Sequence, residues 1–293
     1  MENKGLLHNM GGWSQFFFFC FLAFFGMIAA TFVLAMSLNM DNLWQSANTM
    51  RLAQAIQTII MFLCSALAFA YLCHGNVKSY FKVEIDVNFK YLLLAVVLII
   101  ALQPLVYAVS YYNHQLVLPD FLAPLENWMK EKEVVTERIM NLLFEKRTIT
   151  ELVFNLLVIA VVAGLAEEFF FRGCIQQIIQ KIVNNPHTAV WIAAIIFSVM
   201  HFQFYGFVPR VLLGALLGYL YIWSGNIWVP VIIHTIHNAI NIVIAFVFYN
   251  TEMYVRMENF NLADNTLFII PSAFLSSVAL FILYRKKIIA FKN

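Results

Sequence analysis

The sequence predicts an all-α, polytopic membrane protein with about eight transmembrane helices, and three observations lead to this prediction. Of the 293 residues, 62% are hydrophobic and only 12% are charged, whereas soluble domains carry about 25% charged residues. The mean hydropathy is +0.78, and apolar runs recur along the whole chain. This composition excludes a disordered chain and a secreted disulfide scaffold. The net charge of +2 is too balanced to suggest nucleic acid as a partner.

Eight segments are apolar enough to be transmembrane helices, since a helix needs about 20 mostly apolar residues to cross a bilayer. The segment 152–182 continues past its apolar part with helical spacing and one polar face, so we expect it to project beyond the bilayer. Asn184, Asn185 and Pro186 are expected to end it. The eight predicted spans are residues 14–38, 52–73, 91–112, 152–182, 188–204, 207–224, 227–249 and 267–284.

The longest polar stretch is the connection 113–150, where basic and acidic residues alternate with an apolar helical stripe. This pattern predicts an amphipathic helix that lies on the membrane surface. The sequence shows no internal repeat and no second domain, so residues 1–293 are expected to form a single membrane domain.

An even number of spans places both chain ends on one side of the membrane. Basic residues gather in the 74–90 loop and in the C-terminal tail, and cytoplasmic segments are enriched in Lys and Arg. We therefore expect both termini to be cytoplasmic. These basic residues are Lys78, Lys82, Lys90, Arg285, Lys286, Lys287 and Lys292.

Charged residues lie mostly in loops, and the exception is the group Glu167, Glu168 and Arg172 inside the fourth span. Each charge at the centre of a span costs about 2.5–3.5 kcal/mol, so the group is interpreted as functional. The alternative is a self-neutralising ion pair at a helix end. Glu168 and Arg172 are four residues apart and share a helix face. Glu167 faces elsewhere, which makes it the candidate general base.

Histidines in two other spans add imidazoles to this acid. Glu167 and His201 are each about 22–26 Å from the 184–186 turn at 1.5 Å per residue, so antiparallel helices would bring them to one depth. His234 is only eight residues from the turn at Asn226 and fits this depth less well. The seventh span holds two His-x-x-x-Asn pairs, His234/Asn238 and His237/Asn241, and spacing alone does not choose between them.

A glutamate base, imidazoles and an amide donor are the parts of a hydrolase. Other chemistries lack support in the sequence. It contains no H-E-x-x-H zinc helix, no G-x-S-x-G elbow and no G-x-x-x-x-G-K-[ST] phosphate loop.

Three short motifs in order along the chain resemble those of the CPBP (Abi) family. The motifs are Glu167-Glu168-Phe-Phe-Phe-Arg172, Phe197-Ser-Val-Met-His201 and His234-Thr-Ile-His-Asn238, and the family pattern is EExxxR, FxxxH and HxxxN. That family comprises the CAAX prenyl endopeptidases and bacteriocin-processing or immunity proteins. The resemblance covers residues 155–245, which we take as the CPBP-like catalytic core.

The resemblance implies a role for each matching residue. Glu167 would activate a water molecule, with Glu168 and Arg172 as its supporting pair. His201 would position the water or bind the oxyanion, and Asn238 would be an oxyanion donor. A Trp-x-Pro segment precedes the family's histidine, which favours His234/Asn238 over His237/Asn241.

The predicted function is therefore an intramembrane endopeptidase that cleaves a membrane-associated protein or peptide in the lipid bilayer, CAAX-type processing being one such activity. No cofactor is firmly implied. Glu167, His201 and His234 would be the ligands of a zinc-type divalent metal, and a metal-free glutamate mechanism is equally consistent with them. One alternative is a proton-coupled transporter, which predicts broken helices and an internal repeat. Another is a non-catalytic bacteriocin-immunity-type protein on the same fold.

Overall fold

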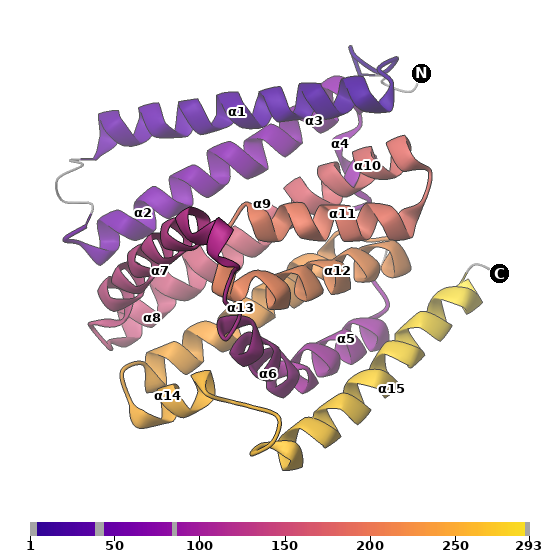
Figure 1. Cartoon of the computed structure of the whole chain (residues 1–293). Helices are drawn as coiled ribbons and strands as arrows, with labels where there is room; N and C mark the ends of the chain where they lie inside the picture. The colour runs from indigo at the N-terminus through magenta and orange to yellow at the C-terminus, as the bar shows by residue number, and fades with distance from the viewer. Residues whose placement is uncertain (1–4, 39–43, 84–86, 291–293) are drawn as a thin grey trace.

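The computed structural model describes residues 5–38, 44–83 and 87–290, and these residues form helices and turns with no strand. Figure 1 shows the helices packed as one bundle. In chain order they are α1 (Gly12–Ser37), α2 (Ala47–Gln57), α3 (Ser65–His74), α4 (Val77–Phe81), α5 (Phe89–Ala101), α6 (Gln103–His114), α7 (Ala123–Phe144), α8 (Ile149–Asn155), α9 (Ala163–Phe170), α10 (Gln176–Val183), α11 (Pro186–Val199), α12 (Phe207–Ser224), α13 (Trp228–Phe248), α14 (Glu252–Glu258) and α15 (Thr266–Ala290).

The all-α, polytopic membrane class is confirmed, but a count of about eight spans is not. Within the described part of the chain, six helical segments are long and apolar enough to cross a membrane. They are Gly12–Ser37, Ala47–His74, Ile149–Val183, Phe204–Ser224, Trp228–Phe248 and Thr266–Arg285.

Two of the predicted spans account for the difference. Helices α5 and α6 bend by 42° where they meet and add a seventh span only if they are taken together. Pro104 lies in the first turn of α6, and a proline there lacks the N–H that would continue the α5 hydrogen bonds. No broken helix is visible in the sequence, whereas the structure contains this bent pair. Helix α11 has only 14 residues, so it is too short to qualify by itself.

The fourth predicted span is continuous and long, as expected. It runs for 35 residues from Ile149 to Val183 and includes two π-helical stretches, η4 (Leu156–Val162) and η5 (Phe171–Ile175). A further π-helical stretch, η2 (Thr58–Cys64), lies between α2 and α3. Asn184 ends the span in the left-handed region, at a φ of 53°. The Asn185 side chain then caps α11. These asparagines end the helix as predicted.

The two chain ends lie at the same end of the bundle, because α1 begins and α15 ends there (Figure 1). That both termini lie on one side of the membrane stays a prediction. Their cytoplasmic location stays a prediction. Of the basic residues on which it rests, Lys292 lies outside the described residues.

The 113–150 connection contains the predicted amphipathic helix, α7. Its buried side chains are Met129, Leu143 and Phe144. Figure 1 shows α7 beside α8, at the end of the bundle away from the chain ends, and α14 lies at that end too. Helices α7 and α14 both contribute residues to the cavity described below.

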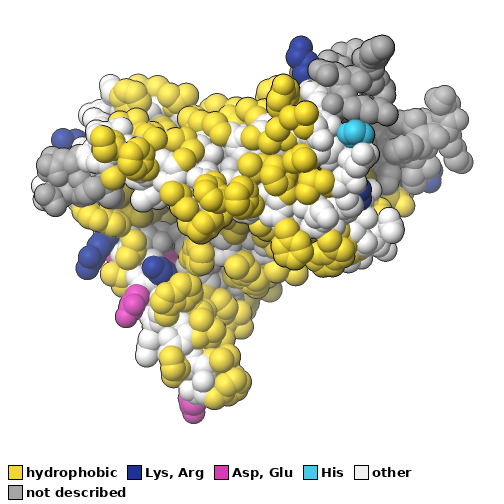
Figure 2. Space-filling model, turned by 90° about the horizontal axis from the view of Figure 1, so that it is seen from above, with side chains coloured by type: hydrophobic (Ala, Val, Ile, Leu, Met, Phe, Trp, Pro, Cys, Tyr) yellow, Lys and Arg dark blue, Asp and Glu magenta, His cyan; other side chains and the backbone are white. Residues whose placement is uncertain are grey.

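The outer surface of the bundle is strongly apolar. Phe17 and Phe32 of α1 are 66% and 65% exposed, and the view over α1 shows mainly hydrophobic side chains with charges near the edges (Figure 2). Such a large exposed apolar surface is typical of a face that contacts lipid.

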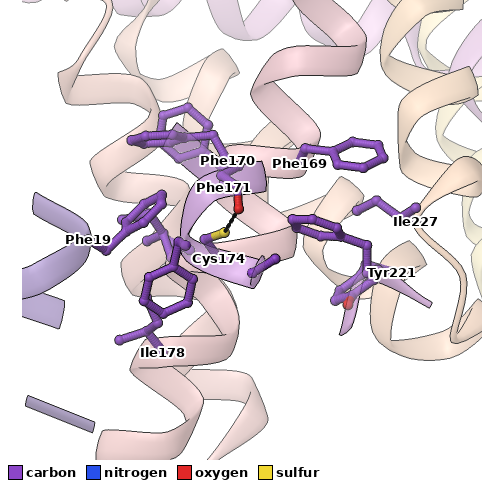
Figure 3. Close-up of a cluster of buried hydrophobic side chains, with 14 of the residues drawn as sticks. Phe19, Phe169, Phe170, Phe171, Cys174, Ile178, Tyr221 and Ile227 are labelled. Carbon is purple, nitrogen blue, oxygen red and sulfur yellow. Dashed lines mark hydrogen bonds between the residues drawn. The ribbon is translucent and has the colours of Figure 1, made fainter. Parts of the chain in front are cut away.

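An aromatic cluster fixes the segment that follows the two glutamates. Phe19 of α1 packs on Phe170, with ring centroids 4.7 Å apart, and Phe171 packs on Phe197 at 5.0 Å. At its centre Cys174 is fully buried, with its Sγ 3.9 Å from the Ala66 carbonyl oxygen (Figure 3). The segment that follows the two glutamates is therefore closely packed against α1 and α11.

Gly164 sets the separation of α9 and α13. A Cβ added there would lie 2.7 Å from Oγ1 and 3.2 Å from the backbone nitrogen of Thr235. We predict that Gly164→Val pushes these helices apart and destabilises the protein by about 1–3 kcal/mol, measured as a lower Tm of the purified protein in detergent. Gly11→Val is the matched control, because nothing lies within 4 Å of its added Cβ. Equal Tm values for the two variants would contradict the tight α9–α13 contact.

Candidate functional site

Three helical regions bring the predicted site residues together. Helix α9 carries Glu167 and Glu168, and Arg172 follows in η5. His201 lies just after α11, which ends at Val199, and α13 carries His234. The Gly164 contact places α9 directly against α13.

Glu168 is the centre of a buried ionic network. Its side chain has no exposed surface, and its Oε1 accepts from Arg172 Nη1 and from His234 Nδ1, both at 2.7 Å. Arg172, 1% exposed, also donates from Nη2 to the Gly214 carbonyl at 2.9 Å and lies over the Phe197 ring at 4.9 Å. The predicted pair of Glu168 and Arg172 is present, and it also ties α12 and α13 to α9.

His234 bridges the two neighbouring glutamates. Because the Glu168 carboxylate only accepts, the bond to it assigns the proton to Nδ1 of the imidazole. The other nitrogen, Nε2, then lies 3.8 Å from Oε2 of Glu167. This separation is longer than a direct hydrogen bond, and it is one that a bridging water can span. His234 reaches both acids although it lies only eight residues after Asn226.

Glu167 faces a cavity of about 540 Å³. Glu168 and Arg172 are absent from its walls, so the two adjacent glutamates have different surroundings, as the helix-face argument predicts. Apolar residues of α6, α7, α12, α13 and α14 supply much of the rest of the lining. The polar and charged residues in the walls include Glu167, His201, Gln203, Arg210, His234, His237, Asn238, Asn241 and Glu258.

Phe197 holds the two imidazoles around one ring. His201 Nδ1 donates to the Phe197 carbonyl at 2.7 Å. The Phe197 ring meets the rings of His201 and His234 edge to face, with centroids 4.8 and 5.7 Å away. The His201 bond leaves Nε2 as the nitrogen available to the cavity.

The stretch 200–206 that carries His201 is held by α6. Asn113 donates from Nδ2 to the Phe204 carbonyl at 2.8 Å and accepts from the Val208 N–H at 3.0 Å. Ser198 Oγ donates to the Phe207 carbonyl at 2.8 Å. Protein side chains thus satisfy polar backbone groups where α11 stops, as irregular backbone at membrane depth requires.

The two His-x-x-x-Asn pairs line the same cavity but have different partners. Asn238 Nδ2 donates to the Ile159 carbonyl at 3.1 Å, which uses one of its two amide hydrogens. His237 lies between two amides, 3.3 Å from Gln103 Nε2 and 3.2 Å from Asn241 Nδ2. Of the two histidines, only His234 contacts the glutamates.

The predicted metal ligands Glu167, His201 and His234 are not arranged as a metal site. Among the residues that the structure describes, no group of three or more His, Cys, Asp or Glu side chains is placed to hold a metal ion. The Nδ1 atoms of both histidines are engaged with protein acceptors. These bonds leave Nε2 of each histidine as the nitrogen that a metal would use, and metal dependence stays a prediction.

Sequence reasoning missed Arg210 and Gln203. The interpretation that Glu167, Glu168 and Arg172 were the only charges within apolar segments is wrong, because Arg210 lies inside the predicted span 207–224. The sequence does show Arg210 as a basic residue near the start of that apolar span. Gln203 stands in a turn, and nothing in the sequence distinguishes it.

Part of the chain matches a known protein family. Residues 149–240 match the family described as "Type II CAAX prenyl endopeptidase Rce1-like". The resemblance to the CPBP family is confirmed. The match covers about a third of the chain and contains all three motifs.

A relative with similar sequence is an uncharacterized protein, YpbD, of Bacillus subtilis (strain 168). It is 34% identical over 88 residues, which are 29% of this chain and 42% of that protein. The chain thus spans less than half the length of this relative. No solved structure matches.

Removal of the Glu168 charge tests the buried network. We predict that Glu168→Gln leaves Arg172 unpaired in the interior and destabilises the protein by about 3–5 kcal/mol, measured by thermal unfolding in detergent. Glu126→Gln is the control, because Glu126 and Lys130 form an ion pair of the same i,i+4 spacing at the surface, and we expect it to leave the Tm unchanged. A Tm of Glu168→Gln equal to that of the wild type would show that the network does not stabilise the fold.

Proposed function

We propose that this protein is an intramembrane endopeptidase in which Glu167 activates water to hydrolyse a peptide bond. The observation that carries the proposal is the position of Glu167. Its carboxylate faces a cavity among the transmembrane helices and lies 3.8 Å from the His234 imidazole, which a second, buried glutamate orients.

The first step is attack on the peptide carbonyl. The Glu167 carboxylate takes a proton from a water molecule, and the resulting hydroxide forms a bond to the carbonyl carbon while the carbonyl electron pair moves onto oxygen. Neutral His201 accepts a hydrogen bond from this water through Nε2, the nitrogen that its bond to Phe197 leaves available. The amide hydrogen of Asn238 that Ile159 does not use donates to the oxyanion.

The second step breaks the carbon–nitrogen bond. The tetrahedral intermediate collapses, its oxygen electron pair re-forms the carbonyl, and protonated Glu167 gives its proton to the leaving amine. The products are a carboxylic acid and an amine, and Glu167 returns to its starting charge. Throughout, Glu168 and Arg172 act through His234, whose ring orientation and proton position they fix.

The cavity supports a peptide substrate that is bound to the membrane. Its volume of about 540 Å³ holds several residues of an extended chain, and its walls are largely apolar. The matching family is described as CAAX prenyl endopeptidases, and we extend that class of substrate to this chain as part of the proposal.

Neutralising Glu167 tests the proposal. We predict that Glu167→Gln lowers the rate of peptide cleavage by at least about 10²-fold, because it removes the general base. The measurement is terminal-peptide mapping of membranes that contain the wild type or the variant, followed by kinetics of the purified proteins on the peptides identified.

The control for this test is Glu137→Gln, which removes an exposed carboxylate of α7 outside the cavity and is expected to cleave at the wild-type rate. A correctly folded Glu167→Gln protein with undiminished cleavage would refute the proposal. Reconstituted vesicles that show Glu167-dependent proton-coupled flux and no proteolysis would favour the transporter instead.

A pair of histidine variants separates the two His-x-x-x-Asn pairs. We predict that His234→Gln lowers cleavage by about 10²-fold or more, because His234 alone contacts the glutamates. His237→Gln is expected to have a much smaller effect, since its contacts are amides. The kcat of each purified variant decides between them, and a greater loss in His237→Gln would assign the role to the His237/Asn241 pair.

A further inference from the structure

Arg210 is a charged residue in the cavity that the proposed reaction does not use. It lies in the first turn of α12, within the membrane-spanning segment Phe204–Ser224, and its half-buried side chain lines the same cavity as Glu167. A charge at this depth is costly, and such residues commonly mark a binding site or a pathway.

The Arg210 guanidinium has no carboxylate partner in the described part of the chain. Its Nη1 and Nη2 donate to the Gln203 carbonyl at 3.3 Å and to Gln203 Oε1 at 2.6 Å. Neither Glu133 nor Glu167 lies within the 4.0 Å of an ion pair with Arg210. Arg172, by contrast, has Glu168 at 2.7 Å.

Neighbouring residues hold the Arg210 side chain in one orientation. Gln203, its acceptor, donates from Nε2 to Thr136 Oγ1 of α7 at 2.9 Å. A Cβ on Gly206 would lie 2.7 Å from Arg210 Nη2, so only glycine leaves this space to the guanidinium. Because Gln203 binds Nη1 and Nη2, the Nε–H stays without a described acceptor and is available to a ligand.

We infer that Arg210 binds a carboxylate of the peptide substrate in the cavity, an inference that rests on the proposed endopeptidase function. A guanidinium edge matches the two oxygens of a carboxylate. The positive charge of Arg210 also offsets the repulsion between the substrate carboxylate and Glu167 in the same cavity. The carboxylate is either the C-terminus of the peptide or an Asp or Glu side chain. An anchor at a fixed distance from Glu167 also selects the peptide bond that reaches the base.

Binding to an inactive protein tests this inference. The intact chain with Glu167→Gln is purified in detergent, and its affinity is measured for three fluorescein-labelled decapeptides of one apolar sequence. The first ends in a free carboxylate and the second in a C-terminal amide. The third has the amide and a glutamate as its penultimate residue.

The expected result is that at least one carboxylate peptide binds about tenfold or more tightly than the plain amide, and that Arg210→Gln abolishes this preference. The peptide that gains affinity identifies the source of the carboxylate. Arg138→Gln, which removes an exposed cation of α7, is the control and should keep the preference. If Arg210→Gln does not fold, Arg210→Lys keeps the charge without the planar fork and should weaken the preference.

Equal binding of the three peptides, or a preference that survives both Arg210 variants, would overturn the inference. The proposed function is tested separately, because binding to the Glu167→Gln protein needs no cleavage. An Arg210-dependent preference together with a wild-type protein that cleaves none of the peptides would support carboxylate binding and count against the endopeptidase.

Discussion

A carboxylate with no exposed surface, held between a guanidinium and an imidazole, is the interaction on which the interior of this protein depends. Glu168 joins Arg172 on its own helix to His234 on α13, and Arg172 continues to the backbone of α12. One carboxylate oxygen thus connects α9 with α13, and Arg172 extends the connection to α12. In a medium of low dielectric constant, each of these groups would be costly alone, and their mutual contact offsets part of that cost.

Residues of the same chemical type are divided between this network and the cavity. Glu168 is enclosed and bonded, whereas Glu167, one position earlier on the helix, faces open space. The two arginines differ in the same way, since Arg172 is neutralised and Arg210 is not. The 100° rotation between successive residues of a helix is enough to produce the first contrast. The contrast between the two arginines depends on the turn before α12, where Gln203 and not a carboxylate accepts from Arg210.

Much of this arrangement follows from the sequence, because helix period and hydropathy are local properties. They gave the all-helical class, the helix in 113–150, the stop at Asn184 and the contact of Glu168 with Arg172. The number of spans could not be counted this way, since the bend near Pro104 and the early end of α11 depend on packing. The partners of His234 and Arg210 come from other helices, so no spacing within one segment could reveal them.

The family-like segment 149–240 also has a partner outside its own boundaries. Asn113 of α6 makes two hydrogen bonds to the backbone that follows His201: its amide donates to the Phe204 carbonyl, and its side-chain oxygen accepts from the Val208 N–H. If the three motifs were transferred to another scaffold, backbone groups near His201 would therefore lack hydrogen-bond partners in the apolar interior. The His201 imidazole would then no longer be held in position. Helix α6, which lies outside the matched segment, is in this sense part of the support for His201.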